Sequence, residues 1–327
     1  ALFSLVLFIL FSACTSTSVP ETNYSPAIRA CRESILKIME EQGIPGVSVA
    51  VVTDSGVLWT EGFGFSDTDN KIPINPDTLF SIQSMSKNIT AAAVLKAVDE
   101  GLLDLDVPIT NYLPGFTVDS CFENNPQEKM TLRLLLSHRA GFTHEAPVGN
   151  NFVPGKFTEH IQSISHTWLR FPVGQRYSYS NLGVDLAGWI LQIRTKMPFH
   201  KYVEQKLLDP LKMTMSSFDM EKIKADSKKA IGHDGSGMKL PVDIPMVPSG
   251  GFYSSASELA RWVQWHLNEG KINGKALISM DLFKQMTAIP NQLPGQNSGY
   301  GLGTGIRMNH GSLRFGHGGG GFGFLSA

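Results

Sequence analysis

The stretch "SIQSMSKNITAAAVLKAVDEG", residues Ser81–Gly101, combines a helical apolar pattern with a polar start. Its apolar residues recur at helical spacing: Ala91, Val94, Leu95, Val98 and Leu102. This spacing predicts one apolar stripe of an amphipathic helix. Ser84 and Lys87 stand three residues apart where this helix begins, so their side chains are expected on one face of its first turn.

The spacing S-x-x-K does not identify a site by itself. It occurs three times, at Ser34/Lys37, Ser84/Lys87 and Ser236/Lys239. Serine is also a favoured helix N-cap, so the pattern is compatible with a purely structural role. The first pair lies in a charged amphipathic helix and the third in the glycine-rich turn "HDGSGMKLP". The surrounding sequence must therefore decide between the three pairs.

Composition indicates a globular protein. The chain has 327 residues, of which 42% are hydrophobic and 17% charged, and its formal net charge is -1. This length can bury one large core or two modest ones. A near-neutral charge argues against a nucleic-acid partner, which would require a basic face.

The N-terminal run "ALFSLVLFILFSAC" is almost entirely apolar and ends in small residues before Cys14. It is shorter than the roughly 20 residues that span a bilayer, and it is typical of the apolar region of an export signal. The run also resembles a bacterial lipobox in which Cys14 carries lipid. Residues 1–25 are therefore predicted to be an export signal and a polar tether, and the protein to be exported, either periplasmic or membrane-anchored. A buried helix packed on the domain is the alternative.

The rest of the chain, residues 26–327, is predicted to form one α/β domain. A helix from about Pro26 to Gly43 precedes "GVSVAVVT" and "VLWTEGFGF", two β-rich runs joined by a tight turn and expected to form an antiparallel hairpin. Residues 103–238 contain mostly short helices and loops, and two glycine-rich strand candidates follow near the end. This order predicts a sheet interrupted by an α-helical insertion, with a cleft between them.

Two further segments supply polar residues suited to serine chemistry. A serine hydroxyl needs a base to act as a nucleophile, and a neighbouring lysine amine is one solution. The segment "PVGQRYSYSNLGVDLAGWI" places Tyr179 and Asn181 before a helix, where tyrosine can relay a proton and asparagine can hold lysine or substrate. The segment "RFGHGGGGFGF" places His317 before four glycines, where a substrate can lie against the chain. The motifs G-x-S-x-G and H-E-x-x-H are absent, and no metal site is predicted.

These segments together resemble the serine β-lactamase-related superfamily, which includes class C β-lactamases, penicillin-binding proteins, D-amino-acid peptidases and family VIII carboxylesterases. That superfamily carries S-x-x-K, Y-x-N and then Lys-Thr-Gly or His-x-Gly, in this order. The corresponding residues here are Ser84-Met85-Ser86-Lys87, Tyr179-Ser180-Asn181 and His317-Gly318-Gly319. The flanks "TLFSIQSMSK", "LRLLLSHRAGF" and "PSGGFYSSASELARW" are similar as well, from about Ile44 to the last residue.

The resemblance implies an antiparallel sheet flanked by helices and a serine hydrolase that acts through an acyl-enzyme on small esters, amides or D-amino-acid peptides. It implies Ser84 as nucleophile and Lys87 with Tyr179 as the acid and base. Asn181 would position groups, and His317 would support Tyr179 and the substrate. The N–H groups of Ser84 and Gly320 would form the oxyanion hole beside Gly319. It gives His138 and His144 no chemical role, so these are interpreted as structural or rim residues. No cofactor is expected.

Two departures from the superfamily pattern affect the interpretation. Histidine replaces the lysine that meets the substrate carboxylate in β-lactamases, so antibiotic hydrolysis is the alternative activity rather than the first. A protein that binds penicillin or another ligand without turnover is a further alternative. The sequence stops at Ala327, where the superfamily usually continues through another strand and a helix, so we expect a truncated chain. Cys31 and Cys121 are the remaining cysteines and are available to pair in an oxidising compartment.

Overall fold

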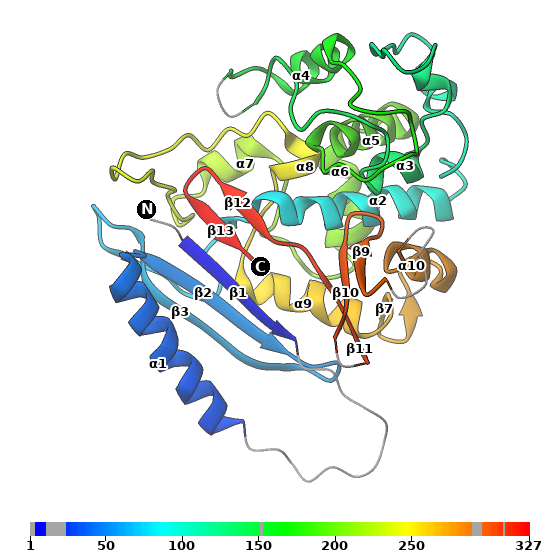
Figure 1. The fold of residues 1–327 in the computed structure, drawn as a ribbon. Helices are drawn as coiled ribbons and strands as arrows, with labels where there is room; N and C mark the ends of the chain where they lie inside the picture. The colour runs from blue at the N-terminus through cyan, green and yellow to red at the C-terminus, as the bar shows by residue number, and fades with distance from the viewer. Residues whose placement is uncertain (1–3, 11–23, 151–152, 290–295, 310) are drawn as a thin grey trace.

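The computed structural model describes residues 4–10, 24–150, 153–289, 296–309 and 311–327 (Figure 1). Its helices are α1 (Ser25–Gln42), α2 (Ser86–Asp99), α3 (Leu132–Leu136), α4 (Phe157–Ser163), α5 (Asn181–Thr195), α6 (Phe199–Val203), α7 (Met220–Ala225), α8 (Val247–Gly250), α9 (Ala256–Leu267) and α10 (Met280–Met286). Short 3-10 segments are η1 (Gln83–Met85), η2 (Ile109–Asn111), η3 (Pro126–Glu128) and η4 (Ile164–His166), and a π-helical turn, η5, spans Glu204–Leu208.

The strands of the described residues form one larger sheet and three small ones. The larger sheet has the order β12-β13-β1-β2-β3-β4, made of Gly319–Gly321, Phe324–Ser326, Ser4–Leu10, Gly46–Val52, Val57–Asp67 and Ile72–Pro73. A second sheet contains β11 (Ser312–Gly316), β10 (Gly305–Asn309) and β9 (Ser298–Tyr300). Two-stranded pairs join β5 (Phe80–Ser81) to β6 (Tyr253–Ser254) and β7 (Lys271–Ile272) to β8 (Lys275–Ala276).

The hairpin β2–β3 confirms the sequence prediction. The two strands pair antiparallel from Gly46 opposite Gly64 to Val52 opposite Val57. Every residue of β2 is buried, because helices cover both faces of this strand. Successive side chains point to opposite faces, which gives each face its own set of apolar residues. Val47, Val49 and Val51 pack with Ile35 of α1, whereas Ala50 and Val52 pack with Ala256 and Ala260 of α9.

Helix α2 is more deeply buried than its sequence pattern predicted. The pattern indicated a single apolar stripe, but most of the helix is buried, including the polar residues Lys87, Asn88 and Thr90. The reason is that α2 lies between the sheet side of the molecule and the helices α5, α6 and α8 (Figure 1). A helix enclosed in this way needs small or apolar residues on every side, which the run Ala91–Leu95 supplies.

The two halves of the chain after α2 differ in how well the sequence described them. Between residues 103 and 238 the described chain forms helices α3–α7 and isolated β-bridges but no extended strand, as predicted. The glycine-rich end was predicted as two strands, and its described residues form five, β9–β13. Glycines permit the intervening turns. Between β12 and β13, Phe322 and Gly323 both have positive φ, the conformation of a tight hairpin turn.

Strand β1 lies between β2 and β13 and runs parallel to both. The predicted export signal overlaps this strand, but Cys14 and most of the tether lie outside the described residues, so export and lipidation stay predictions. None of the described helices is long and apolar enough to cross a bilayer. The possible Cys31–Cys121 disulfide is not formed, because both thiols are free.

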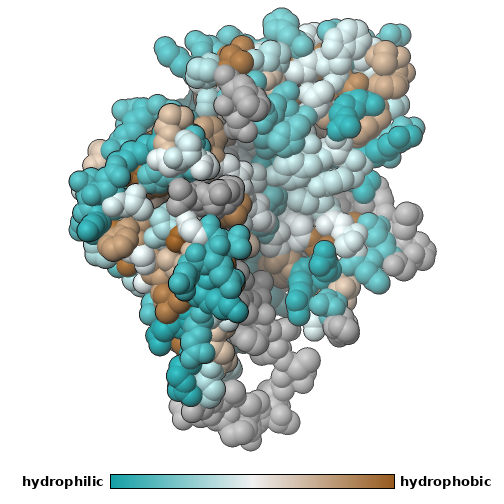
Figure 2. Space-filling view, turned by 60° about the vertical axis from the view of Figure 1, so that its left-hand side comes forward, coloured by the Kyte–Doolittle hydropathy of each residue, from teal (hydrophilic) through white to brown (hydrophobic). Residues whose placement is uncertain are grey.

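The surface seen in Figure 2 is mainly hydrophilic, and its apolar residues form small separate groups. Most large apolar side chains instead belong to the buried clusters around α2, β2 and α9. The core therefore holds the start of α2, with its polar residues, inside the molecule.

Candidate active site

Ser84 and Lys87 meet at the junction of η1 and α2. Ser84 lies in η1 and is half-buried, whereas Lys87 lies in the first turn of α2 and is fully buried. The ammonium nitrogen Nζ of Lys87 is 3.0 Å from Ser84 Oγ and donates to the carbonyl oxygen of Ser249 at 2.8 Å. The lysine is therefore held beside the hydroxyl, within reach of its proton.

The other two S-x-x-K pairs lack this environment. Ser34 and Lys37 are both exposed on α1. Ser236 and Lys239 are also exposed, and each contacts an aspartate: Ser236 donates to Asp234 at 2.7 Å, and Lys239 pairs with Asp69 at 2.8 Å. Burial thus distinguishes Ser84/Lys87 from its two counterparts.

The environment of Lys87 makes its amine a proton acceptor near neutral pH. Burial lowers the pKa of Lys87 from its ordinary value of 10.5 to about 7, and the charge of Asp185 opposes this decrease. Desolvation disfavours the ammonium form, so a sizeable fraction of the side chain is neutral at pH 7. A neutral amine beside a hydroxyl can remove the hydroxyl proton, as a general base must.

Tyr179 lies on the other side of Lys87. It belongs to the extended segment that leads into α5, and Lys87 Nζ stands 4.9 Å from its ring centroid. Burial raises the pKa of Tyr179, and a hydrogen-bonding interaction with Ser84 opposes the rise. The phenol therefore keeps its proton at neutral pH and can donate it to a leaving group or relay it to the amine.

Asn181 is the first residue of α5, close to Tyr179 in the chain but directed elsewhere. Its side-chain nitrogen donates to the sulfur of Met246 at 3.4 Å, and its backbone N–H donates to the backbone carbonyl of His144 at 3.1 Å. The sequence suggested that this amide holds lysine or substrate. In the structure its side-chain hydrogen bond goes to Met246, so a role toward substrate stays a prediction.

His317 stands between β11 and β12 and faces Tyr179. The centroids of the two rings are 5.9 Å apart, and Nδ1 donates to the carbonyl of Gly318 at 2.6 Å. Since a carbonyl only accepts, the neutral ring leaves Nε2 as an acceptor, and Nε2 is buried without a hydrogen-bond partner among the described residues. Burial and then the charge of Lys87 lower the pKa of His317 to about 4, so the ring is neutral at pH 7.

Strand β12 passes directly over the serine. A Cβ placed on Gly319 would lie 3.0 Å from the backbone nitrogen of Ser84 and would overlap the carbonyl oxygen of Ile82. A side chain at this position is excluded, which explains glycine here. Gly320 is the next residue of this outermost strand and is exposed. The strand and η1 are thus in close contact at Gly319, and a shared oxyanion site formed by the N–H groups of Ser84 and Gly320 stays a prediction.

Two histidines given no role from the sequence also border Tyr179. His138 is only 2% exposed and its ring lies 4.4 Å from that of Tyr179 and 4.6 Å from that of Tyr300. Burial and the charge of Lys87 keep the pKa of His138 well below 6.5. His144 is exposed, and its ring stacks on that of Tyr179 with the two ring centroids 5.7 Å apart. His144 thus lies at the rim and His138 has a structural place in the packing around the tyrosine, which agrees with their interpretation as structural or rim residues.

Sequence reasoning missed Asp185, Ser249 and His160. Asp185 lies one helical turn after Asn181 on α5, so the i,i+4 spacing was an available signal for a residue on the same face. Ser249 and His160 gave no such signal, because they come from α8 and α4. Among the described residues, no group of three His, Cys, Asp or Glu side chains is arranged to hold a metal ion.

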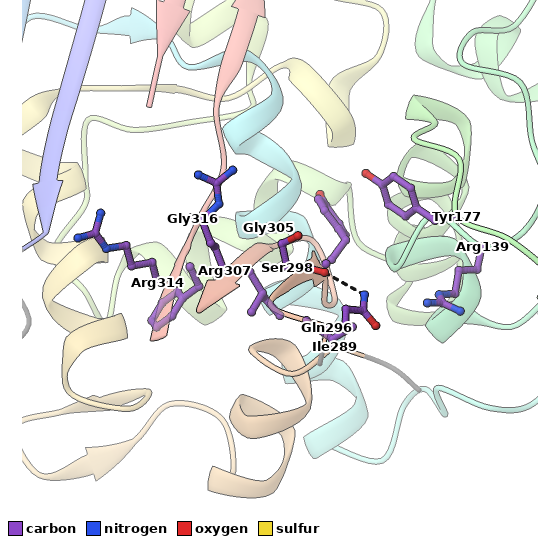
Figure 3. A pocket seen from close by; sticks show the side chains of 13 residues that line it. Arg139, Tyr177, Ile289, Gln296, Ser298, Gly305, Arg307, Arg314 and Gly316 are labelled. Atoms are coloured by element: carbon purple, nitrogen blue, oxygen red, sulfur yellow. Dashed lines mark hydrogen bonds between the residues drawn. The ribbon is translucent and has the colours of Figure 1, made fainter. Parts of the chain in front are cut away.

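A cavity of about 680 Å³ opens beside the aromatic residues (Figure 3). Its lining includes Arg139 and Tyr177 on one side and Arg307 and Arg314 on the other. Tyr300 also lines it, and the described lining residues include no aspartate or glutamate. The cavity is close to the serine site, since the ring of Tyr300 also contacts those of Tyr179 and His317. It can therefore receive an anionic group of a bound molecule.

Comparison with known proteins agrees with this geometry. The family model described as Beta-lactamase matches residues 32–325, which include all three sequence motifs. The chain belongs to the beta-lactamase family.

Curated relatives share part of their length with the chain. "Protein flp" of Staphylococcus aureus strain MRSA252 is 30% identical over 244 residues, which are 70% of this chain and 47% of that protein. A mitochondrial serine beta-lactamase-like protein of Mus musculus is 38% identical over 121 residues, 37% of this chain and 22% of that protein. The chain spans about half the length of the first of these relatives.

Solved structures share the fold over most of the chain. The octameric penicillin-binding protein homologue from Pyrococcus abyssi has a TM-score of 0.76 at 26% sequence identity, and the match covers 90% of this chain and 68% of the homologue's chain. The D-alanine carboxypeptidase AmpC from Burkholderia cenocepacia has a TM-score of 0.71 at 21% identity, covering 87% and 75%. The D-amino acid amidase from Ochrobactrum anthropi SV3 has a TM-score of 0.70 at 23% sequence identity, and the match covers 90% of this chain and 84% of the amidase chain. The predicted β-lactamase/transpeptidase-like fold is thereby confirmed.

Proposed function

We propose that the protein is a serine hydrolase that forms an acyl-enzyme on Ser84 and acts on small esters, amides or D-amino-acid peptides. The observation that carries this proposal is the buried Lys87 amine, 3.0 Å from Ser84 Oγ and with a pKa of about 7. An ordinary surface lysine, with a pKa of about 10.4, would be almost fully charged at pH 7 and could not accept a proton.

The reaction follows from the positions of three side chains. Lys87 takes the hydroxyl proton as Ser84 Oγ attacks the substrate carbonyl, and the N–H groups near Ser84 and Gly320 bind the developing oxyanion. The bond to the leaving group then breaks, and Tyr179 gives its proton to the leaving oxygen or nitrogen and takes one in turn from the protonated Lys87 amine. Water next attacks the acyl-enzyme carbonyl and gives a proton to the neutral Lys87 amine. The bond between Ser84 Oγ and the acyl carbon then breaks, which releases the acid, and Lys87 returns the proton to Ser84 Oγ.

His317 is the basis for the substrate preference. A neutral imidazole offers one hydrogen bond and no full charge to a substrate carboxylate. Loss of a charge-assisted contact costs about 1–2 kcal/mol of transition-state binding, or roughly tenfold in rate. Uncharged esters and amides do not depend on that contact, so we expect p-nitrophenyl butyrate and D-alanine p-nitroanilide to exceed nitrocefin in kcat/KM.

A second candidate, a true β-lactamase, is favoured by the arginine-lined cavity. Arg307 and Arg314 stand directly opposite each other on β10 and β11, where like charges are unfavourable unless an anion balances them. Neither forms a salt bridge with a described residue. The carboxylate of a β-lactam would find positive charge here even though His317 supplies none. Leading turnover of nitrocefin among the three substrates would favour this second candidate.

The decisive experiment combines labelling with turnover. Wild type, Ser84→Ala and Ser34→Ala are treated with a fluorophosphonate probe and then assayed with the three substrates. Ser34 is the matched control, because it has the same motif spacing on an exposed helix. We expect only Ser84→Ala to lose both labelling and turnover. Undiminished labelling of Ser84→Ala contradicts the assigned nucleophile. Labelled wild type without turnover supports instead a ligand-binding protein that acylates only.

A further inference from the structure

Lys87 is connected to a second buried polar group, Asp185, through the residue that accepts its hydrogen bond. Lys87 donates to the carbonyl of Ser249 at 2.8 Å. The backbone N–H of the same residue donates to Asp185 Oδ1 at 2.9 Å, and its hydroxyl donates to Oδ2 at 3.0 Å. Asp185 therefore holds both the backbone N–H and the hydroxyl of Ser249. The position of the Ser249 carbonyl, which orients the lysine, depends on Asp185 in consequence.

His160 completes this connection. Its Nε2 lies 3.0 Å from Asp185 Oδ2, and its Nδ1 lies 2.9 Å from the carbonyl of Val148. Both ring nitrogens face oxygens that accept hydrogen bonds, an arrangement that satisfies the doubly protonated, positively charged ring. The hydrogen bond and charge of Asp185 outweigh burial and raise the pKa of His160.

The burial of these groups calls for a reason other than stability. The side chains of His160 and Asp185 are both fully buried, as is that of Lys87. A buried ion pair loses its hydration, and apolar residues of similar volume often give a protein at least as stable. A pair at this depth is expected where its charge or its hydrogen bonds serve another group.

Lys87 is the group that these charges face. The ionisable side chains around it are Tyr179 before α5, His138 after α3, His317 before β12, and the pair Asp185 and His160 on α5 and α4. Tyr179 and the two neighbouring histidines are neutral at pH 7 for the reasons given above. Asp185 is the acidic group that acts on Lys87. Asp185 in turn pairs with His160, whose positive charge is also favoured by Glu145.

We propose that Asp185 and His160 are positioning residues that hold Lys87 through Ser249 and balance its charge. This inference rests on the proposed function, because it assigns these residues a part in the action of the general base. The hydrogen bonds of the two side chains go to Ser249, Val148 and each other rather than to Ser84. Their effect passes through the position of the Ser249 carbonyl and through the electrostatic field at the lysine amine.

The proposal predicts shifts of opposite sign for two substitutions. Asp185→Asn removes the negative charge and one of the two acceptor oxygens, so the ammonium loses support and the acidic limb of the kcat/KM profile moves to lower pH. His160→Gln keeps a donor to Asp185 but removes the positive charge. The carboxylate is then uncompensated, the ammonium is favoured, and the limb moves to higher pH. Each shift is about one pH unit for a charge at this range.

Glu258 provides a matched control. Glu258 lies in the first turn of α9, and its buried carboxylate, 2% exposed, accepts hydrogen bonds from the backbone N–H groups of Met215 and Ser216. Glu258→Gln removes a buried charge of the same kind away from the serine site. We expect it to lower the unfolding midpoint without moving the acidic limb.

The experiment measures kcat/KM from pH 5 to pH 9 with p-nitrophenyl butyrate, together with the unfolding midpoint, for wild type and the three variants. Shifts of opposite sign, with Glu258→Gln unshifted, support the proposal, because general damage to the fold would lower activity without moving the limbs apart. If wild type is active and the acidic limbs of wild type, Asp185→Asn and His160→Gln coincide, the proposal is overturned. If Asp185→Asn does not fold, the direction of the shift in His160→Gln decides. An inactive wild type refutes the proposed function instead.

Discussion

Replacement of Lys87 by methionine should stabilise the protein at mildly acidic pH while abolishing turnover. The two side chains have similar length, but methionine carries no charge into the core. Burial lowers the pKa of Lys87 from 10.5 to about 7, so the folded protein holds this proton less tightly than the unfolded chain does. The burial penalty is complete below pH 7, decreases as the pH rises toward 10.5, and is absent above that value.

The magnitude follows from the same values. A decrease of about 3.5 in pKa corresponds to about 5 kcal/mol of destabilisation at pH 6. Methionine removes this penalty but leaves the buried carbonyl of Ser249 without its donor, which costs about 1–3 kcal/mol. We therefore expect Lys87→Met to be more stable than wild type by about 2–4 kcal/mol at pH 6. At pH 10 little of the penalty remains, and the variant should be equal to wild type or less stable.

Urea unfolding followed by far-UV circular dichroism at pH 6 and pH 10 measures both differences. Lys37→Met is the control, because Lys37 is exposed on α1 and its loss should change stability by less than about 0.5 kcal/mol at either pH. The reasoning is refuted if Lys87→Met is destabilised to the same extent at both pH values, since Lys87 would then carry no burial penalty and would be an unsuitable base.

Three further changes test other parts of the structure. Gly319→Ala should lower kcat/KM about tenfold or more, because its Cβ would press on the backbone beside the serine. The control Gly115→Ala, where a Cβ meets open space, should match wild type, and equal activity of the two variants would contradict the close approach of β12. Arg307→Glu combined with Arg314→Glu should raise KM for nitrocefin but not for p-nitrophenyl butyrate; equal effects on both substrates would exclude carboxylate recognition by the cavity. Cys14→Ser should release the protein from the membrane fraction of a bacterial host, and unchanged partitioning would refute lipidation.

The sequence was sufficient for features that depend on neighbours along the chain. The hairpin β2–β3 was predictable because two β-rich runs flank a tight turn, and Ser84 and Lys87 were predictable as partners because residues three apart share a helix face. Ordered motifs and their flanks also selected the family. The glycine-rich end was less predictable, since glycine fits strands and turns alike, and two expected strands became five.

The surroundings of the lysine were decided by the tertiary structure alone. Ser249 is 162 residues from Lys87 in sequence, and His160 and Asp185 come from two further helices. No local pattern marks such contacts, because they result from the packing of many side chains between distant segments. The same packing determines how deeply Lys87 is buried, and burial gives this lysine a pKa near 7. The ordered motifs were enough to select Ser84 and Lys87 among the three serine–lysine pairs, whereas the folded core supplies the burial and the distant partners that make this lysine a base.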